Sequence, residues 1–190
     1  MRQLRLFIAV NFPDDVKRTL GLFIRNLSKV PSDLKWVEEK NLHLTVQFLG
    51  NVSEERVPVV STALQNSVAG IAPFKLGLEG VGAFPSVERP RVLWVGFSGE
   101  TAPLLTLHRQ VQREMRVLGF EPEKRKFSPH LTLARARSPY GISDVMEQAR
   151  EIIGIGKVFG TARIDSIELM QSDLQAKGPR YFILSRAPMS

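Results

Sequence analysis

The chain contains the tripeptide His-Leu-Thr twice, at residues 43–45 and 130–132, although it has only three histidines in 190 residues. The surrounding sequence repeats as well, because Arg5 precedes the first of these histidines by 38 residues and Arg91 precedes the second by 39. A period of about 87 residues is far too long for a solenoid array. The repeat therefore predicts two similar lobes that arose by internal duplication.

Hydrophobic periodicity indicates what each half contains. In the first half, apolar residues follow a helical spacing after Asp14 and Asp15, and they alternate like a half-buried strand over 42–49. In the second half, a helical stripe over 102–118 precedes the strand HLTLA and a second helical stripe over 145–152. We therefore expect an α+β fold with two lobes, made of antiparallel sheets with outer helices, that face one another across a central cleft. Residues 1–190 would form a single bilobal domain.

The alternation over 42–49 assigns side chains to two faces of a strand. His43 and Thr45 fall on one face, whereas Phe48 falls on the apolar face with the leucines. Equivalent strands of two facing lobes would present His43 and His130 to each other across a pseudo-twofold axis. The rings of Phe48 and Trp36 could stack on a nucleic-acid base, although both also fit core positions.

Two His-x-Thr pairs at one place suit chemistry on a phosphate. Histidine can act as an acid or a base near neutrality, so one ring could take a proton from attacking water while the other gives one to the departing oxygen. The hydroxyls of Thr45 and Thr132 lie two residues further along each strand and could touch the same anion. Arg135, five residues after His130, adds a permanent positive charge.

A structural reading competes with this functional one. A single His-x-Thr on a strand is usually part of the wet face of an antiparallel sheet, and duplication carries residues along whether or not they are used. Copied surface positions are free to diverge, however, so two intact copies favour function. His108 is a contrasting case, because it falls on the apolar stripe of the helix over 102–118 and is expected to be a hydrogen-bonded residue without chemistry.

Several other classes of protein are excluded by what the sequence lacks. There is no cysteine, no His-Glu-x-x-His motif and no carboxylate beside either triplet, so we expect no metal and no cofactor. The nucleophile elbow of serine hydrolases and the phosphate-binding glycine loops are also missing. No apolar run approaches the ~20 residues that span a bilayer, and the apolar start has no cleavage site for a signal peptidase, so we expect a cytoplasmic protein. The net charge of +7 would attract a polyanion such as nucleic acid.

With both triplets, FLG after the first, PH before the second and AR after it, the chain resembles the two-histidine (2H) phosphoesterases. More narrowly, it is similar to the RNA 2',3'-cyclic phosphodiesterases, historically called 2'-5' RNA ligases. The resemblance extends from RLFIAV through PRVLWVG to GPRY. It implies a bilobal fold, catalysis without a metal, and hydrolysis of a terminal 2',3'-cyclic phosphate to a 2'-phosphate. We expect a monomer.

The resemblance also implies roles for individual residues. His43 would donate a proton to the leaving 3' oxygen, and His130 would accept one from water. Thr45 and Thr132 would hold phosphate oxygens, and Arg135 would add charge. Members of this family join tRNA halves, cleave 2'-5' bonds or open cyclic ends, so the RNA substrate stays open. The alternative is a module that binds RNA ends without turnover, which the two histidines disfavour because arginine or lysine would hold phosphate better at pH 7.

Overall fold

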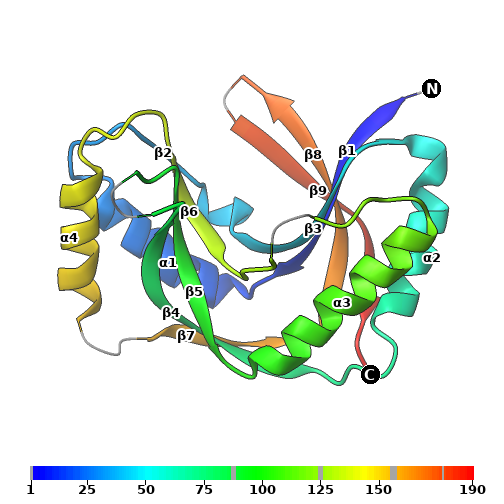
Figure 1. Ribbon diagram of the computed structural model, residues 1–190. Helices are drawn as coiled ribbons and strands as arrows, with labels where there is room; N and C mark the ends of the chain where they lie inside the picture. Colours follow the sequence, from blue (N-terminus) through cyan, green and yellow to red (C-terminus); the bar gives the residue numbers. More distant parts are fainter. Residues whose placement is uncertain (1, 87–88, 124–125, 155–157, 177) are drawn as a thin grey trace.

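The computed structural model describes residues 2–86, 89–123, 126–154, 158–176 and 178–190 (Figure 1). The strands are β1 (Gln3–Asn11), β2 (Leu34–Trp36), β3 (His43–Ser53), β4 (Phe74–Phe84), β5 (Val92–Gly99), β6 (Leu131–Ala136), β7 (Val158–Ile164), β8 (Ser166–Gln175) and β9 (Gly178–Pro188). The helices are α1 (Asp14–Leu27), α2 (Val57–Ser67), α3 (Thr101–Val117) and α4 (Ile142–Ile153), and the 3-10 turns are η1 (Glu39–Asn41) and η2 (Glu54–Arg56). None of the helices in this part of the chain is long and apolar enough to cross a membrane.

The strands pair in the order β7-β4-β5-β6-β3-β1-β8-β9, with β2 also on β6, and the described pairs are antiparallel. β3 and β6 meet at one register position, where Leu44 lies opposite Leu131. On one side lies a first lobe of β3, β1, β8 and β9, and on the other a second lobe of β6, β5, β4 and β7. The predicted pair of similar antiparallel lobes is therefore confirmed, and β1 and β5 occupy equivalent places beside the two triplet strands.

Helices α1 and α3 exchange lobes, whereas α2 and α4 pack on the lobe of the triplet strand that precedes them. α2 packs on β8 and β9 and α3 packs on β3, whereas α1 packs on β7 and α4 on β4. Figure 1 shows the resulting arrangement, with α2 and α3 on one side of the molecule and α1 and α4 on the other. The helix that follows β1 thus covers the second lobe, and the helix that follows β5 covers the first. This exchange interlocks the two halves of the chain around one shared core.

The main core is an apolar cluster that runs through both lobes, and a smaller cluster of Phe7, Ala9 and Met170 lies apart from it. The helical stripe predicted over 102–118 is α3, whose Leu104, Leu107 and Val111 are completely buried. Burying a leucine or valine side chain contributes roughly 1.5 to 3 kcal/mol. The stripe spacing of three and four residues is therefore what holds α3 against the first lobe.

Both triplet strands contain a β-bulge directly after the threonine. On β3, Thr45 lies opposite Ala9 but Gln47 lies opposite Ile8, so that Val46 is an extra residue. A bulge of this kind puts two residues on one strand against one on its partner and changes the alternation of side chains. Accordingly Val46 and Gln47 are both buried, although they are neighbours in the sequence.

The second bulge has the same position relative to its triplet. Thr132 lies opposite Trp94 but Ala134 lies opposite Leu93, which makes Leu133 the extra residue on β6. Leu133 and Ala134 are both completely buried. The bulges therefore recur at equivalent places in the two lobes.

The first bulge overturns the predicted placement of Phe48. Regular alternation puts Phe48 on the apolar face, but the extra residue turns it to the face of His43, where its side chain is 52% exposed. Gln47 moves the other way and is only 1% exposed. Arg135 stands at the position in β6 that Phe48 holds in β3, five residues after the histidine. The two bulges therefore bring one aromatic and one cationic side chain to the same face as the histidines.

Candidate active site

The two triplets meet where the lobes join. Leu44 and Leu131 lie opposite one another and both are buried in the core. Because successive side chains on a strand point to opposite faces, the residues that flank these leucines point away from the core. The antiparallel pairing directs each histidine toward the threonine of the other triplet. These four flanking residues are His43, Thr45, His130 and Thr132.

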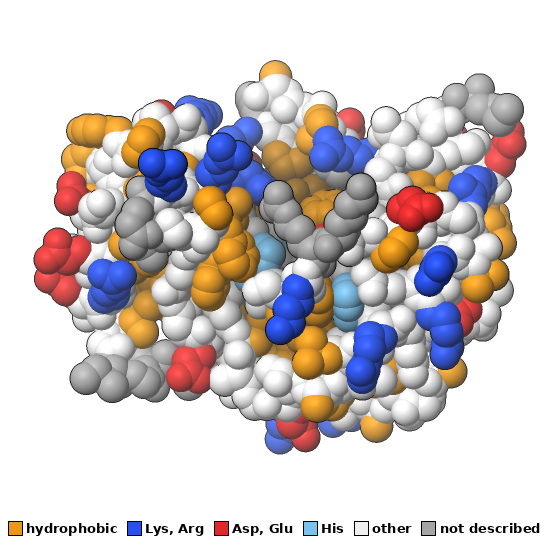
Figure 2. All heavy atoms as spheres, viewed as in Figure 1, with side chains coloured by type: hydrophobic (Ala, Val, Ile, Leu, Met, Phe, Trp, Pro, Cys, Tyr) orange, Lys and Arg blue, Asp and Glu red, His pale blue; other side chains and the backbone are white. Residues whose placement is uncertain are grey.

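A cleft of about 610 Å³ opens over this junction. Its lining includes all six residues that the sequence proposed for the site, namely His43, Thr45, Phe48, His130, Thr132 and Arg135. Figure 2 shows a hollow in the middle of this face, with histidine atoms visible at it and lysine and arginine side chains on the surface around it. Residues 87 positions apart in the sequence are thus gathered in one place.

The hydrogen bonds of His43 fix its tautomer. Its Nδ1 lies 2.7 Å from the carbonyl oxygen of Asn41. A carbonyl only accepts, so Nδ1 carries the proton and donates it. The other nitrogen, Nε2, lies 3.1 Å from the hydroxyl oxygen of Thr45 and accepts its hydrogen in the neutral ring. His43 therefore offers an unprotonated Nε2 beside a threonine hydroxyl.

His130 is held in the same way. Its Nδ1 donates to the carbonyl oxygen of Ser128 at 2.7 Å, again the residue two positions earlier in the chain. The nitrogen left to meet a ligand in the cleft is again Nε2. The duplication thus reproduces both the residue types of the two triplets and the backbone bond that orients each imidazole.

Both imidazoles are poor proton acceptors in this environment. The pKa of His43 is lowered to about 4, chiefly by burial and also by the charges of Lys17, Arg135 and His130, while the bond to Asn41 acts in the opposite direction. Burial also lowers the pKa of His130, assisted by the charge of Arg135. Both rings are therefore largely neutral at pH 7. An anion between them would raise both pKa values, because it favours the charged form of each ring.

Aromatic side chains frame the histidines. The ring of His43 lies 5.0 Å from Phe7 and edge-on to Tyr181 at 5.1 Å, and that of His130 lies edge-on to Phe84 at 4.9 Å. Burial raises the pKa of Tyr181, although Arg135 and Arg5 oppose this effect, so its hydroxyl stays protonated at neutral pH. These contacts restrict the planes of both imidazoles.

Sequence reasoning did not identify the aromatic frame or all of the positive charge. Arg5 and Lys35 line the cleft with Arg135, and among the described lining residues Glu38 is the one carboxylate. An apolar residue such as Phe7 has the same sequence pattern whether its strand face meets the core or the cleft. The recurrence of arginine before both histidines was a signal for Arg5, but its counterpart Arg91 is not among the lining residues.

The turn that holds His43 is itself tied to distant parts of the chain. Asn41 is nearly buried, and its Nδ2 donates to the carbonyl oxygen of Pro179 at 3.1 Å. Lys17, on α1, donates from Nζ to the carbonyl oxygen of Lys40 at 3.5 Å. The carbonyl group that orients His43 is therefore held between α1 and the start of β9.

A buried carboxylate lies behind this turn. Glu168 is 2% exposed and accepts hydrogen bonds from Asn11 and from Arg186, whose Nη2 lies 2.6 Å from Oε1. Lys17 bonds to the side-chain oxygen of Asn11 at 3.4 Å. Burial lowers the pKa of Lys17, while Asp14 and Glu168 raise it. The cation that disfavours protonation of His43 is thus embedded in a network of fixed polar groups.

His108 lies outside the cleft. It is buried on α3, and its ring is stacked on Phe127 with centroids 3.8 Å apart. The sequence predicted a hydrogen-bonded histidine at the helix edge, and the contact that the structure shows for this ring is the aromatic stack. Burial lowers its pKa, which keeps the ring neutral at pH 7.

Comparisons with known proteins agree with this geometry. The family model for LigT like phosphoesterase matches the chain twice, over residues 10–94 and 95–181. An RNA 2',3'-cyclic phosphodiesterase from Archaeoglobus fulgidus is 36% identical over 179 residues, which cover 94% of this chain and 96% of the relative. One from Aeropyrum pernix is 37% identical over 150 residues, covering 78% and 82%.

Solved structures show the same architecture. A Thermus thermophilus protein superposes with a TM-score of 0.77 at 28% identity, with 97% of each chain covered. LigT from E. coli in complex with 3'-AMP gives a TM-score of 0.77 at 25% identity, covering 100% of this chain and 99% of that one. Because the family model matches both halves and the relatives match along most of their length, the chain belongs to the LigT-like phosphoesterase family.

Proposed function

We propose that this protein hydrolyses the 2',3'-cyclic phosphate at the end of an RNA and leaves a 2'-phosphate. The main support is the convergence of two His-x-Thr pairs in one cleft, with the Nδ1 of each imidazole bonded to a backbone carbonyl. The relatives named RNA 2',3'-cyclic phosphodiesterase match over most of this chain. The nucleotide in the E. coli LigT complex gives further support for a ligand of this class.

The phosphate would lie between the two triplets. The hydroxyls of Thr45 and Thr132 donate to its unesterified oxygens, and Arg135 contributes a guanidinium that balances its negative charge. Thr45 has to release Nε2 of His43 to do so, because its hydroxyl bonds to that nitrogen at 3.1 Å. Phosphate binding thereby frees the nitrogen that takes part in the reaction.

The two imidazoles divide the proton transfers. His130 takes a proton from water at Nε2 while the water oxygen forms a bond to phosphorus. His43 gives the proton on its Nε2 to the 3' oxygen, which receives the electron pair of the P–O bond that breaks. The pKa of about 4 means that His43 gains this proton only with substrate, when the phosphate charge favours the imidazolium. Exchange with solvent then restores both rings.

The rest of the cleft suits a nucleotide. The ring of Phe48 is more than half exposed on the cleft face and provides a surface on which the terminal base can stack. Trp36 also lines the cleft and gives a second aromatic surface. Stacking uses the π-face that every base has, so the site would accept different bases.

The RNA substrates would include tRNA halves with cyclic ends, and joining such halves through a 2'-5' bond would be the reverse type of reaction in the same site. A single chain supplies all six proposed residues, so a monomer is sufficient for activity. We place the protein in the cytoplasm with its RNA substrates. The competing function is binding of RNA ends without turnover.

Incubation of the protein with an oligoribonucleotide that ends in a 2',3'-cyclic phosphate, in the presence of a chelator, tests the proposal. We expect a 2'-phosphate product, identified by its resistance to a 3'-specific phosphatase, and no product from a His43→Ala/His130→Ala double variant. Binding without turnover by the wild type would support the competing function. A 3'-phosphate product would exchange the leaving oxygen and with it the roles of the two histidines.

A further inference from the structure

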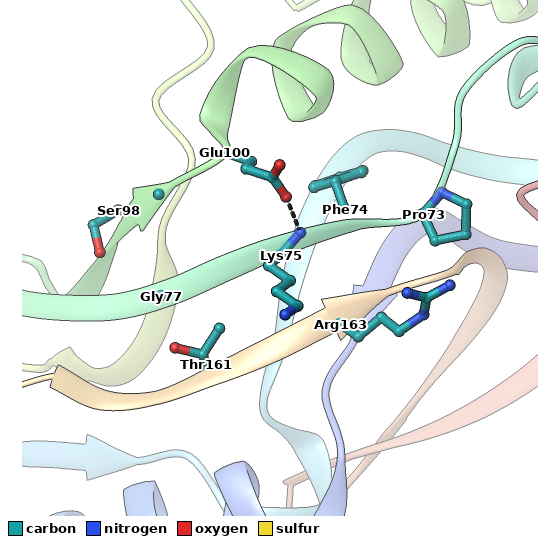
Figure 3. Close-up of a pocket in the computed structure, with 9 residues that line it drawn as sticks. Pro73, Phe74, Lys75, Gly77, Ser98, Glu100, Thr161 and Arg163 are labelled. Atoms are coloured by element: carbon teal, nitrogen blue, oxygen red, sulfur yellow. Dashed lines mark hydrogen bonds between the residues drawn. The ribbon is translucent and has the colours of Figure 1, made fainter.

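A second pocket lies on the second lobe, away from the catalytic cleft. It has a volume of about 440 Å³ and sits over β4, β5 and β7 beside the start of α3. Figure 3 shows Lys75, Thr161 and Arg163 on neighbouring strands, with Ser98 across the hollow and Glu100 at the start of the helix. We propose that this pocket binds a backbone phosphate of the RNA body, upstream of the cyclic end.

The strand register makes this pocket both open and polar. Gly77 of β4 lies opposite Ser98 of β5 on one side and Thr161 of β7 on the other. Directly opposite residues share a face of the sheet, and glycine has no side chain, so the floor between the two hydroxyl-bearing residues stays clear. In the next row on the same face, Lys75 lies opposite Arg163.

Lys75 and Arg163 form an unfavourable pair unless an anion joins them. Like charges that lie directly opposite on neighbouring strands repel and destabilise the sheet. Within the described residues, neither cation forms a salt bridge. The Glu100 carboxylate also lines the pocket, and it accepts a hydrogen bond from the backbone N–H of Lys75 at 2.6 Å. The cross-strand pair Arg186 and Glu168 in the first lobe, by contrast, neutralises itself.

The pocket faces the same side of the sheet as the proposed catalytic residues. Trp94 of β5 lies opposite Thr132, so Trp94, Gly96 and Ser98 share the face of Thr132. Trp94 and Ser98 are four residues apart, which corresponds to about 13 Å along a strand. The Trp94 ring lies against Gly82, where an added Cβ would collide with it. The surface between the cleft and the pocket therefore includes an indole and two glycines, with the exposed carboxylate of Glu79 opposite Gly96 on the neighbouring strand.

This geometry suggests a path for the RNA. The cyclic phosphate is the 3' end of the strand, so the remaining nucleotides extend from the 5' side of the terminal ribose. A strand that leaves the cleft over Trp94 and Gly96 arrives at the hydroxyls and the two cations. Aromatic surfaces combined with a cationic track are the usual means of holding single-stranded nucleic acid without sequence preference. The inference rests on the proposed function, since it concerns the same RNA.

The test compares a long substrate with a short one. We would measure kcat/KM for an oligoribonucleotide of about ten nucleotides with a cyclic end, within the usual footprint of single-strand binding proteins, and for a mononucleotide 2',3'-cyclic phosphate. The Lys75→Ala/Arg163→Ala variant should lose about tenfold on the oligonucleotide and nothing on the mononucleotide. Its slope of log affinity against log salt should fall by about 0.7 per lost phosphate contact.

Two controls separate charge in the pocket from other effects. Lys29→Ala/Arg150→Ala removes two exposed cations, one two residues after the end of α1 and one on α4, on the helix-covered face of the same lobe, and it should behave as wild type. Lys75→Arg/Arg163→Lys keeps both charges and should restore binding of the oligonucleotide. The proposal would be overturned if Lys75→Ala/Arg163→Ala kept the wild-type kcat/KM on the oligonucleotide or lost as much on the mononucleotide. It would also be overturned if the Lys29→Ala/Arg150→Ala control lost as much on the oligonucleotide. If the wild type turns over neither substrate, the proposed hydrolysis fails, and the direct binding measurements still decide whether the pocket holds RNA.

Discussion

Protonation of His43 should couple the stability of the fold to pH. Burial is the main cause that lowers its pKa from 6.5 to about 4 in the folded protein, and the bond to Asn41 only partly offsets it. The unfolded chain therefore binds this proton first as the pH falls. The corresponding stability is fully present above pH 6.5 and is lost between pH 6.5 and about 4. At 1.36 kcal/mol per pKa unit, the loss amounts to about 3 kcal/mol.

The His43→Asn variant isolates this contribution. Asparagine does not titrate, and its amide can still donate toward the carbonyl oxygen of Asn41. We would measure the free energy of unfolding of both proteins by urea denaturation at pH values from about 7.5 to about 4. All other groups titrate in both proteins, so their effects cancel. The wild type should lose about 3 kcal/mol more than the variant over this range.

The result that would refute the reasoning is a pair of parallel stability curves. Parallel curves would mean that His43 has a similar pKa in the folded and unfolded chains and is therefore not desolvated by its surroundings. An independent check is the titration of the His43 ring by NMR in the folded protein. Its midpoint should lie near 4 in the wild type and rise when Lys17→Met removes one of the cations that oppose protonation.

Four further predictions concern activity and substrate binding. The profile of kcat/KM against pH should be bell-shaped with its alkaline limb below 6.5, because burial lowers the pKa of both His43 and His130. Bound phosphate should shift the kcat profile to higher pH. A kcat/KM plateau through pH values of about 8 would contradict this prediction. Either single histidine-to-alanine change should cost about 10²- to 10⁴-fold in kcat with RNA affinity largely retained, as checked by single-turnover kinetics and direct binding. Arg135→Ala should weaken binding and reduce the salt slope by about 0.7, and wild-type values for both would make Arg135 ordinary surface charge. Phe48→Ala should weaken nucleotide binding by about 1 to 3 kcal/mol. Thermal stability should not change, because more than half of this residue is exposed. A calorimetric titration that finds equal affinity would exclude stacking on this ring.

The sequence alone determined the organisation of this protein. The repeated triplet and the spacing of apolar residues predicted two antiparallel lobes with outer helices, which the structure has. Both signals depend only on the order of residues along the chain. Alternation with a period of two, for example, puts His43 and Thr45 on one strand face whichever strand lies beside it. The same reasoning identified His130 and Thr132 as the matching pair in the second lobe.

The surroundings of the histidines were decided by tertiary structure. Backbone carbonyls orient both imidazoles, and every residue has such a carbonyl, so no side-chain pattern marks those of Asn41 and Ser128. Phe7 and Tyr181 come from strands on the far side of His43 and enter the site only through the pairing of β1 with β3 and of β8 with β9. Their sequence patterns are those of ordinary strand residues.

Phe48 marks the limit of the sequence argument most clearly. Counting by twos places it in the core, but the extra residue after Thr45 turns it into the cleft, as the equivalent residue turns Arg135. A bulge belongs to a pair of strands, since it exists only where one strand has two residues against one on its neighbour. The sequence of β3 therefore predicts that its side chains alternate between two faces. Only the pairing of β3 with β1 decides at which residue this alternation is interrupted.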